Sequence, residues 1–188
     1  MGSVRMKKYL TLLAALLLIF KFTINAEAEV KEKGFYLGGG VAYAWENFDV
    51  GGFGFDDAWG LNAFAGYRLM RYIAFEGNFN WYDDFTLDSY DADLQIWTLM
   101  LDVKAMYPVY NDRLVPYLRA GVGYMDKEAS AGSFKSSDSD AAINLGGGLD
   151  FYVTDRFSLG LDGKYVWGTG DLEAIEYFVG TINAAFHF

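Results

Sequence analysis

From residue 34 onward, the chain alternates large apolar residues with small or polar ones in eight segments. An alternation with a period of two is typical of β-strands, because successive side chains point to opposite faces of a sheet. Each segment is close to the about 9–11 residues that a tilted strand needs to cross a bilayer. The predicted strands span residues 34–46, 58–69, 72–82, 95–105, 115–125, 141–153, 156–168 and 177–188.

The charged residues of these segments follow the same alternation, and none falls on an apolar face. An Arg or Lys facing lipid at mid-depth costs about 2–4 kcal/mol, so this distribution favours apolar faces in contact with lipid. The strands must then close on themselves, because an open edge would leave backbone N–H and C=O groups unpaired in hydrocarbon. The pattern therefore predicts an all-β fold, an eight-stranded antiparallel up-and-down transmembrane β-barrel.

All five tryptophans fall on the apolar faces, at one end of the predicted barrel. They are Trp45, Trp59, Trp81, Trp97 and Trp167. Indole has an apolar body and one N–H donor, so it favours the boundary between membrane and water. The links at this end are long, over residues 47–57, 83–94, 126–140 and 169–176. Because bacterial barrels have short periplasmic turns and longer external loops, we expect the tryptophans at the outer boundary.

The first 28 residues have a different pattern. A basic start from Arg5 to Lys8 precedes an apolar run from Tyr9 to Phe20, and Ala26-Glu27-Ala28 forms an A-x-A motif. This order is typical of a secretory signal peptide, and the run is shorter than the about 20 residues of a spanning helix. We expect a cleaved signal peptide over residues 1–28 and a barrel domain over 29–188, with an uncleaved anchor helix as the alternative.

Composition narrows the function classes. The formal net charge is −10, which disfavours nucleic-acid binding because that binding requires Lys and Arg to neutralise phosphates. The chain has no cysteine, so it has neither disulfides nor cysteine metal sites. Aromatic residues make up 19% and glycine is abundant, which suits strands and tight turns.

With this pattern, the chain resembles the small eight-stranded outer-membrane barrels of Gram-negative bacteria, which include the membrane domain of outer-membrane protein A and the opacity-type adhesins. The most specific local match is the end of the chain, where Phe188 is preceded by Phe186. The resemblance implies that these residues form the signal read by the barrel assembly machinery. Asn183 stands where the family often has glycine. The resemblance also implies location in the bacterial outer membrane, with lipopolysaccharide and outer-membrane lipid as neighbours.

The inner face offers the first candidate site, a charge network of four basic and four acidic residues. It comprises Arg68, Glu76, Asp102, Lys104, Arg119, Asp150, Asp162 and Lys164. We expect Arg68 near Glu76, and Arg119 between Asp102 and Asp150. The network is either a gated polar channel for small solutes or a salt-bridged plug. We favour the plug, because eight strands leave an interior that side chains such as Tyr36, Phe64 and Tyr117 can fill.

Catalysis is disfavoured by the placement of histidine. His187 is the single histidine, and the topology puts it at the periplasmic rim. No serine–histidine pair is evident in the sequence, so a nucleophile with its base is not expected. We predict no catalytic residues, no cofactor and no dedicated metal site.

The external loops are the remaining candidate. They hold fifteen acidic residues against Lys127 and Lys135. Carboxylates are ligands for divalent cations, which could bridge to lipopolysaccharide, but no run has the spacing of a calcium loop. We favour a hydrated acidic surface over cation binding, and the loops are also candidates for contact with a host or envelope partner. The sequence thus predicts a structural, surface-displaying and non-enzymatic barrel, with a narrow channel as the alternative.

Overall fold

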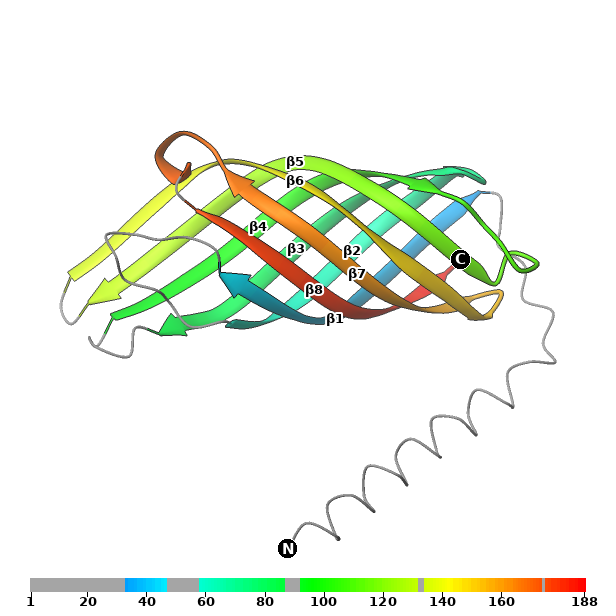
Figure 1. Ribbon diagram of the computed structural model, residues 1–188, viewed down its shortest axis with the longest axis horizontal. Helices are drawn as coiled ribbons and strands as arrows, with labels where there is room; N and C mark the ends of the chain where they lie inside the picture. The colour runs from blue at the N-terminus through cyan, green and yellow to red at the C-terminus, as the bar shows by residue number, and fades with distance from the viewer. Residues whose placement is uncertain (1–32, 47–57, 87–91, 132–133, 174) are drawn as a thin grey trace, which may run out of the picture.

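The computed structural model describes residues 33–46, 58–86, 92–131, 134–173 and 175–188. The predicted signal peptide and the link over residues 47–57 lie outside these ranges. Eight strands form one closed barrel in which each strand pairs antiparallel with its neighbours in sequence, and β1 pairs with β8 (Figure 1). The strands are β1 Gly34–Glu46, β2 Ala58–Met70, β3 Ile73–Thr86, β4 Ala92–Met106, β5 Leu114–Ala131, β6 Phe134–Thr154, β7 Phe157–Gly168 and β8 Glu176–His187.

The predicted faces are confirmed by exposure. Leu101, Leu118 and Ile182 have exposed fractions of 71%, 69% and 68%, whereas the adjacent Asp102 and Arg119 are buried at 2% and 5%. Apolar side chains on the outside and charged ones inside are the reverse of a soluble fold. This arrangement suits a barrel surrounded by lipid. Among the described residues, no helix is both long enough and apolar enough to cross a membrane.

The two ends of the barrel differ in their connections. At the turn end, β2 and β3, β4 and β5, and β6 and β7 are joined by short links over residues 71–72, 107–113 and 155–156. At the opposite loop end, β7 and β8 are joined by a link that contains the short 3-10 helix η1, Gly170–Leu172. The five tryptophan positions all lie toward the loop end, where Trp81 is directly paired with Trp97 and Trp59 with Tyr43.

Two predicted loops are wrong in extent. Most of residues 126–140 belongs to β5 and β6, and β3 and β4 extend to Thr86 and from Ala92 into the predicted 83–94 link. The β5–β6 pairing continues without a register shift to Ala131 opposite Phe134. Beyond the lipid, a strand no longer needs an apolar face, so the alternation that identifies strands disappears while backbone pairing continues.

Candidate functional site: the barrel lumen

The middle of the lumen is built around Arg119, which projects inward from β5. Its guanidinium contacts Glu76 Oε1 at 3.1 Å and Asp162 Oδ2 at 3.2 Å, and it also forms an ion pair with Asp102. These groups come from β3, β4 and β7, and all four side chains are buried. One cation therefore ties together strands from different sides of the barrel through charge-assisted hydrogen bonds.

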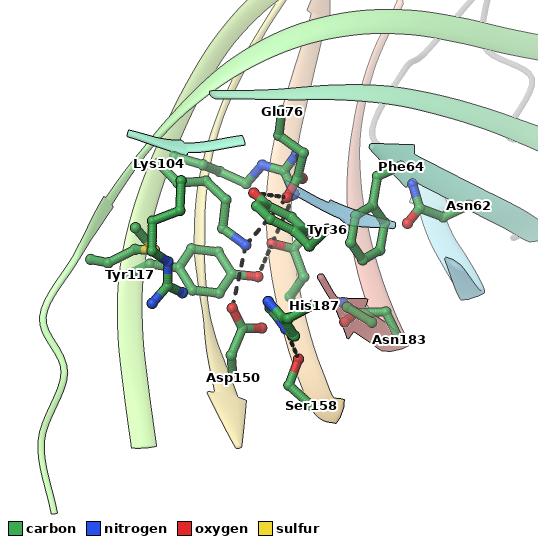
Figure 2. Close-up of a pocket in the computed structure, with 15 residues that line it drawn as sticks. Tyr36, Asn62, Phe64, Glu76, Lys104, Tyr117, Asp150, Ser158, Asn183 and His187 are labelled. Carbon is green, nitrogen blue, oxygen red and sulfur yellow. Dashed lines mark hydrogen bonds and ion pairs between the residues drawn. The ribbon is translucent and has the colours of Figure 1, made fainter. Parts of the chain in front are cut away.

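Lys104, which stands opposite Arg119 in the register of β4 and β5, forms a second ion-pair centre with Glu76 and Asp150 (Figure 2). Its Nζ lies 3.4 Å from Glu76 Oε2 and 3.4 Å from Asp150 Oδ2. The same ammonium group sits 3.8 Å from the centre of the Tyr117 ring, within cation–π range. Glu76 thus joins the Arg119 and Lys104 centres into one network.

Neutral polar side chains provide further hydrogen-bond partners for the charged groups. Asn78 donates to Glu76 and Asp102, and Asn144 donates to Asp102 at 2.6 Å. Lys164 donates to Asn80 Oδ1 at 2.9 Å. Buried ionic groups are tolerated when their lone pairs and protons find partners, and this network provides most of them.

The structure brings the predicted network together with different pairings. Arg119 contacts Asp162 and Glu76 in addition to Asp102, and Asp150 pairs with Lys104 instead of Arg119. Arg68 stands opposite Ala74, while Gly66 stands opposite Glu76. The Arg68 guanidinium instead donates a hydrogen bond to the Tyr152 hydroxyl at 2.7 Å. Strand neighbours were the basis of the prediction, but long side chains in a narrow lumen reach across the barrel to strands that are not paired.

Glycines on the inner face make room for aromatic rings, as expected for Tyr36, Phe64 and Tyr117. A Cβ atom at Gly66 would lie 2.1 Å from Tyr36 Cζ, and one at Gly38 would lie 2.2 Å from Phe64 Cζ. Tyr36 and Tyr117 then donate to Glu76 and Asp162 at 2.8 and 2.9 Å. The glycines therefore hold rings that pack the lumen and bind its charges.

An apolar layer fills the lumen at the loop end, and sequence reasoning missed it. It consists of Ala42, Ala44, Ala58, Tyr82, Ile96, Met100, Met125, Ala142, Val166, Leu172, Ile175, Tyr177 and Val179. Most of these residues have the inward parity of their strand, so the apolar members of the predicted inner faces were the available signal. Leu172 and Ile175 come from the link that holds η1 and had no such signal. Both are buried, so this link packs against the apolar layer at the mouth of the barrel.

A second mixed layer lies at the turn end, where Tyr36, Ala74, Met106, Val115, Tyr117 and Tyr152 form a buried cluster. His187 lies in the same part of the lumen, stacked on Tyr36 at 5.4 Å. Its Nε2 is 2.9 Å from Ser158 Oγ (Figure 2). The expectation that no serine pairs with the histidine is therefore wrong, because the fold brings Ser158 and His187 together. The pair forms only because β7 and β8 are adjacent, with Phe157 opposite Phe186.

The space left between these side chains is small. The cavity lined by Tyr36, Glu76, Lys104, Ser158 and His187 has a volume of about 20 Å³, which is room for roughly one water molecule. Ser158 and His187 thus have no space for a substrate beside them. In the part of the chain that the structure describes, no group of three or more His, Asp or Glu side chains is arranged to hold a metal ion.

The predicted boundary and assembly residues lie on the outside. Trp45 and Trp59 are exposed at the loop end, and Tyr43 contacts both rings at 4.9 Å. Phe186 and Phe188 are exposed at the turn end with their rings 5.2 Å apart. The Phe188 N–H donates to the Phe35 carbonyl at 2.9 Å. Their roles at the membrane boundary and in assembly remain predictions.

A closed antiparallel barrel with an apolar exterior and a charged interior defines a transmembrane β-barrel. Comparison with known proteins makes the class specific: residues 13–188 match the outer membrane protein beta-barrel domain, and the chain belongs to this family. No curated protein matches the chain in sequence. The family and the fold indicate the bacterial outer membrane.

Solved structures of low sequence identity share the fold. Neisserial surface protein A is 15% identical with a TM-score of 0.71, covering 84% of this chain and all of its own. The N-terminal barrel domain of Pseudomonas aeruginosa OprF is 14% identical with a TM-score of 0.60, and the match covers 84% of this chain and 100% of that domain. Ail, the attachment invasion locus protein of Yersinia pestis, is 17% identical with a TM-score of 0.56, and the match covers 85% of this chain and 99% of Ail. These small outer-membrane barrels match over almost their whole lengths.

Proposed function

We propose that this protein is a non-conducting, non-enzymatic barrel that presents its loop end to the exterior as an interaction surface. The observation that carries the proposal is the lumen, which is filled from the apolar layer at the loop end to the cluster at the turn end. A barrel sealed in this way provides a rigid membrane anchor. The ion pairs of Arg119 and Lys104 cross-link its strands from within.

The strands that extend at the loop end support a display role. The β5–β6 hairpin carries exposed Asp138 and half-buried Asp126, Glu128 and Asp140. Lys127 is paired with Asp138 at 3.4 Å. An acidic surface attracts cationic partners and repels anionic ones.

The alternative, a narrow channel, finds less support. A conducting path would have to displace the buried Leu172 and Ile175 at one end and separate the ion pairs of Arg119 in the middle. Breaking a buried ion pair is expensive, so we expect no open path at rest. The Ser158–His187 pair does not support an enzyme either, because the cavity beside it is only about 20 Å³.

Cysteine labelling on intact cells tests the orientation that display requires. The chain has no cysteine, so Ser139→Cys at the loop end and Tyr110→Cys at the turn end each provide a single thiol. Ser139 and Tyr110 are both exposed, which makes them a matched pair. A membrane-impermeant maleimide should label S139C on intact cells and Y110C only after the outer membrane is permeabilised. The reverse labelling pattern would overturn the proposed display.

A further inference from the structure

At the loop end, the extended part of β6 has an edge without a partner among the described strands. The β5–β6 pairing continues from Tyr124 opposite Ala141 to Ala131 opposite Phe134. On its other side, the β6–β7 pairing stops at Ala142 opposite Gly168. Figure 1 shows the β5–β6 hairpin running past the end of β7. Residues 134–140 of β6 are thus paired with a described strand on one side only.

The hydrogen bonds of Ala141 identify which backbone groups face the open side. The Thr169 N–H donates to the Ala141 carbonyl at 2.9 Å, so the Ala141 carbonyl points toward the β7 side. Backbone groups of alternate residues in a strand point to the same side. Lys135, Ser137 and Ser139 therefore direct their N–H and C=O groups outward. The Asp140 carboxylate accepts from the Ala141 N–H at 2.7 Å, which ends the open row.

An open edge of this kind is a template for another strand. Natural proteins commonly blunt such edges with proline, a β-bulge or charged side chains, and Lys135 is the basic side chain on this edge. Residues 134–141 contain no proline, and their pairing with β5 has no register shift. Backbone hydrogen bonds at an edge supply affinity for an extended peptide, while side chains beside it supply specificity.

The charges around the edge indicate the kind of peptide. Asp138 and Asp140 lie on β6 itself, and Asp126 and Glu128 lie on the paired strand β5. In register, Lys127 is opposite Asp138 and is already paired with it at 3.4 Å. With Lys135 counted, four carboxylates stand against two lysines in this part of the hairpin, so a strand added beside β6 would meet a net acidic sheet end. Lysine or arginine side chains would be favoured there.

A second copy in the same membrane does not fit this edge. Barrel strands tilt by about 35–45° from the membrane normal. A twofold axis along the normal would bring two β6 edges together with opposite tilts, so they would cross instead of running side by side. The occupant must therefore be a segment whose direction is not fixed by the same membrane.

We propose that the open edge of β6 over Lys135–Ser139 binds an extended cationic peptide segment of an external partner by β-strand addition. The proposal deepens the proposed display function and depends on the loop end facing outward. The partner segment would continue the sheet formed by the extended parts of β3 to β6. Its lysine or arginine side chains would lie beside Asp138 and Asp140 of β6, with Asp126 and Glu128 of β5 one strand further away.

The test uses the refolded chain in lipid nanodiscs and a fluorescent peptide of alternating lysine and threonine. Fluorescence anisotropy should show saturable binding, and carbon-13 labels in the peptide carbonyls should give the infrared band of a paired strand. An alternating glutamate–threonine peptide and an N-methylated lysine–threonine peptide are the controls. We expect neither to bind, because one has the wrong charge and the other has no N–H groups. Equal binding of the N-methylated peptide would reduce the interaction to charge attraction and overturn the proposal.

A matched pair of variants locates the site. Ser137→Pro removes an outward N–H while leaving the hydrogen bonds to β5, whereas Ser137→Ala keeps it. We expect S137P to weaken peptide binding about tenfold and S137A to leave it unchanged. Unchanged binding by S137P, or no binding by the unaltered chain, would contradict the proposal. The N-methylated peptide keeps the test decisive if S137P does not fold. The labelling of S139C on intact cells is independent of these outcomes, so failure of strand addition is distinguishable from failure of display.

Discussion

Arg119 is the residue on which the interior of the barrel most depends. It is buried and contacts carboxylates from three strands, Glu76, Asp102 and Asp162. Each carboxylate is itself buried, so none can exchange the guanidinium for water. Loss of the cation would leave these negative charges close together in a medium that screens them poorly.

Replacing this cation should therefore destabilise the barrel strongly. We expect Arg119→Met to lower the free energy of unfolding by about 3–5 kcal/mol, the range for an uncompensated buried charge. Urea unfolding in lipid vesicles, followed by tryptophan fluorescence, measures this loss in the free energy of unfolding. The control is Lys127→Met, which breaks the partly exposed Lys127–Asp138 pair and should cost at most about 1 kcal/mol. Equal losses in the two variants would show that the lumen network is not a major source of stability.

Two glycines on β2 and β3 provide a second test at this scale. Gly66→Ala places a Cβ 2.1 Å from Tyr36 Cζ and should destabilise by about 1–3 kcal/mol through overpacking. Gly77 faces outward, and a Cβ there would be 3.8 Å from Leu101 Cδ2. Gly77→Ala should change stability by less than about 0.5 kcal/mol. Thermal unfolding of both variants checks the difference, and a tolerant Gly66 would mean that the Tyr36 ring is not confined.

At the scale of elements, β8 both ends the chain and closes the barrel. It pairs with β1 from Glu46 opposite Tyr177 to Tyr36 opposite His187. The terminal Phe188 adds a backbone bond to Phe35 while its ring stays exposed. The ring of Phe188 is therefore free to be recognised during assembly without being needed for closure.

This separation leads to a prediction for assembly in cells. Phe188→Ala should reduce the amount of folded protein in the outer membrane several-fold, yet leave refolding into detergent unchanged, because the backbone bond persists. Phe178→Ala, on the lipid-facing side of the same strand, is the control and should assemble normally. The heat-dependent shift in gel mobility reports folding in both settings. A loss of refolding in F188A would assign the ring a role in stability.

Sequence reasoning predicted elements well where lipid imposes a rule. For residues such as Leu101 and Asp102, the sequence predicts which side of the strand faces lipid, because a charge on the lipid side is costly. The same reasoning ended β5 too early, at residue 125 instead of Ala131, because no lipid selects the residues beyond the boundary. It also gave no indication that η1 and Leu172 fold into the mouth, since nothing periodic marks a link.

At the scale of the whole molecule, the lumen network was predictable in composition but not in pairing. Parity identified the charged residues, whereas Arg119–Asp162 and Ser158–His187 depend on how long side chains meet across a closed barrel. The apolar layer at the loop end was not predicted, because apolar residues on the inner face, such as Met100 and Val166, differ little in type from those that face lipid. Together these layers make the barrel a filled cylinder, with hydrocarbon outside and paired charge inside.

Single-channel recording in planar bilayers tests this claim most directly. Purified protein is inserted, and insertion is verified separately by protease protection of the same preparation. The filled lumen predicts no stable conductance steps above the bilayer background over the usual voltage range. Reproducible steps of uniform size from the unaltered chain would contradict the account and favour the narrow channel.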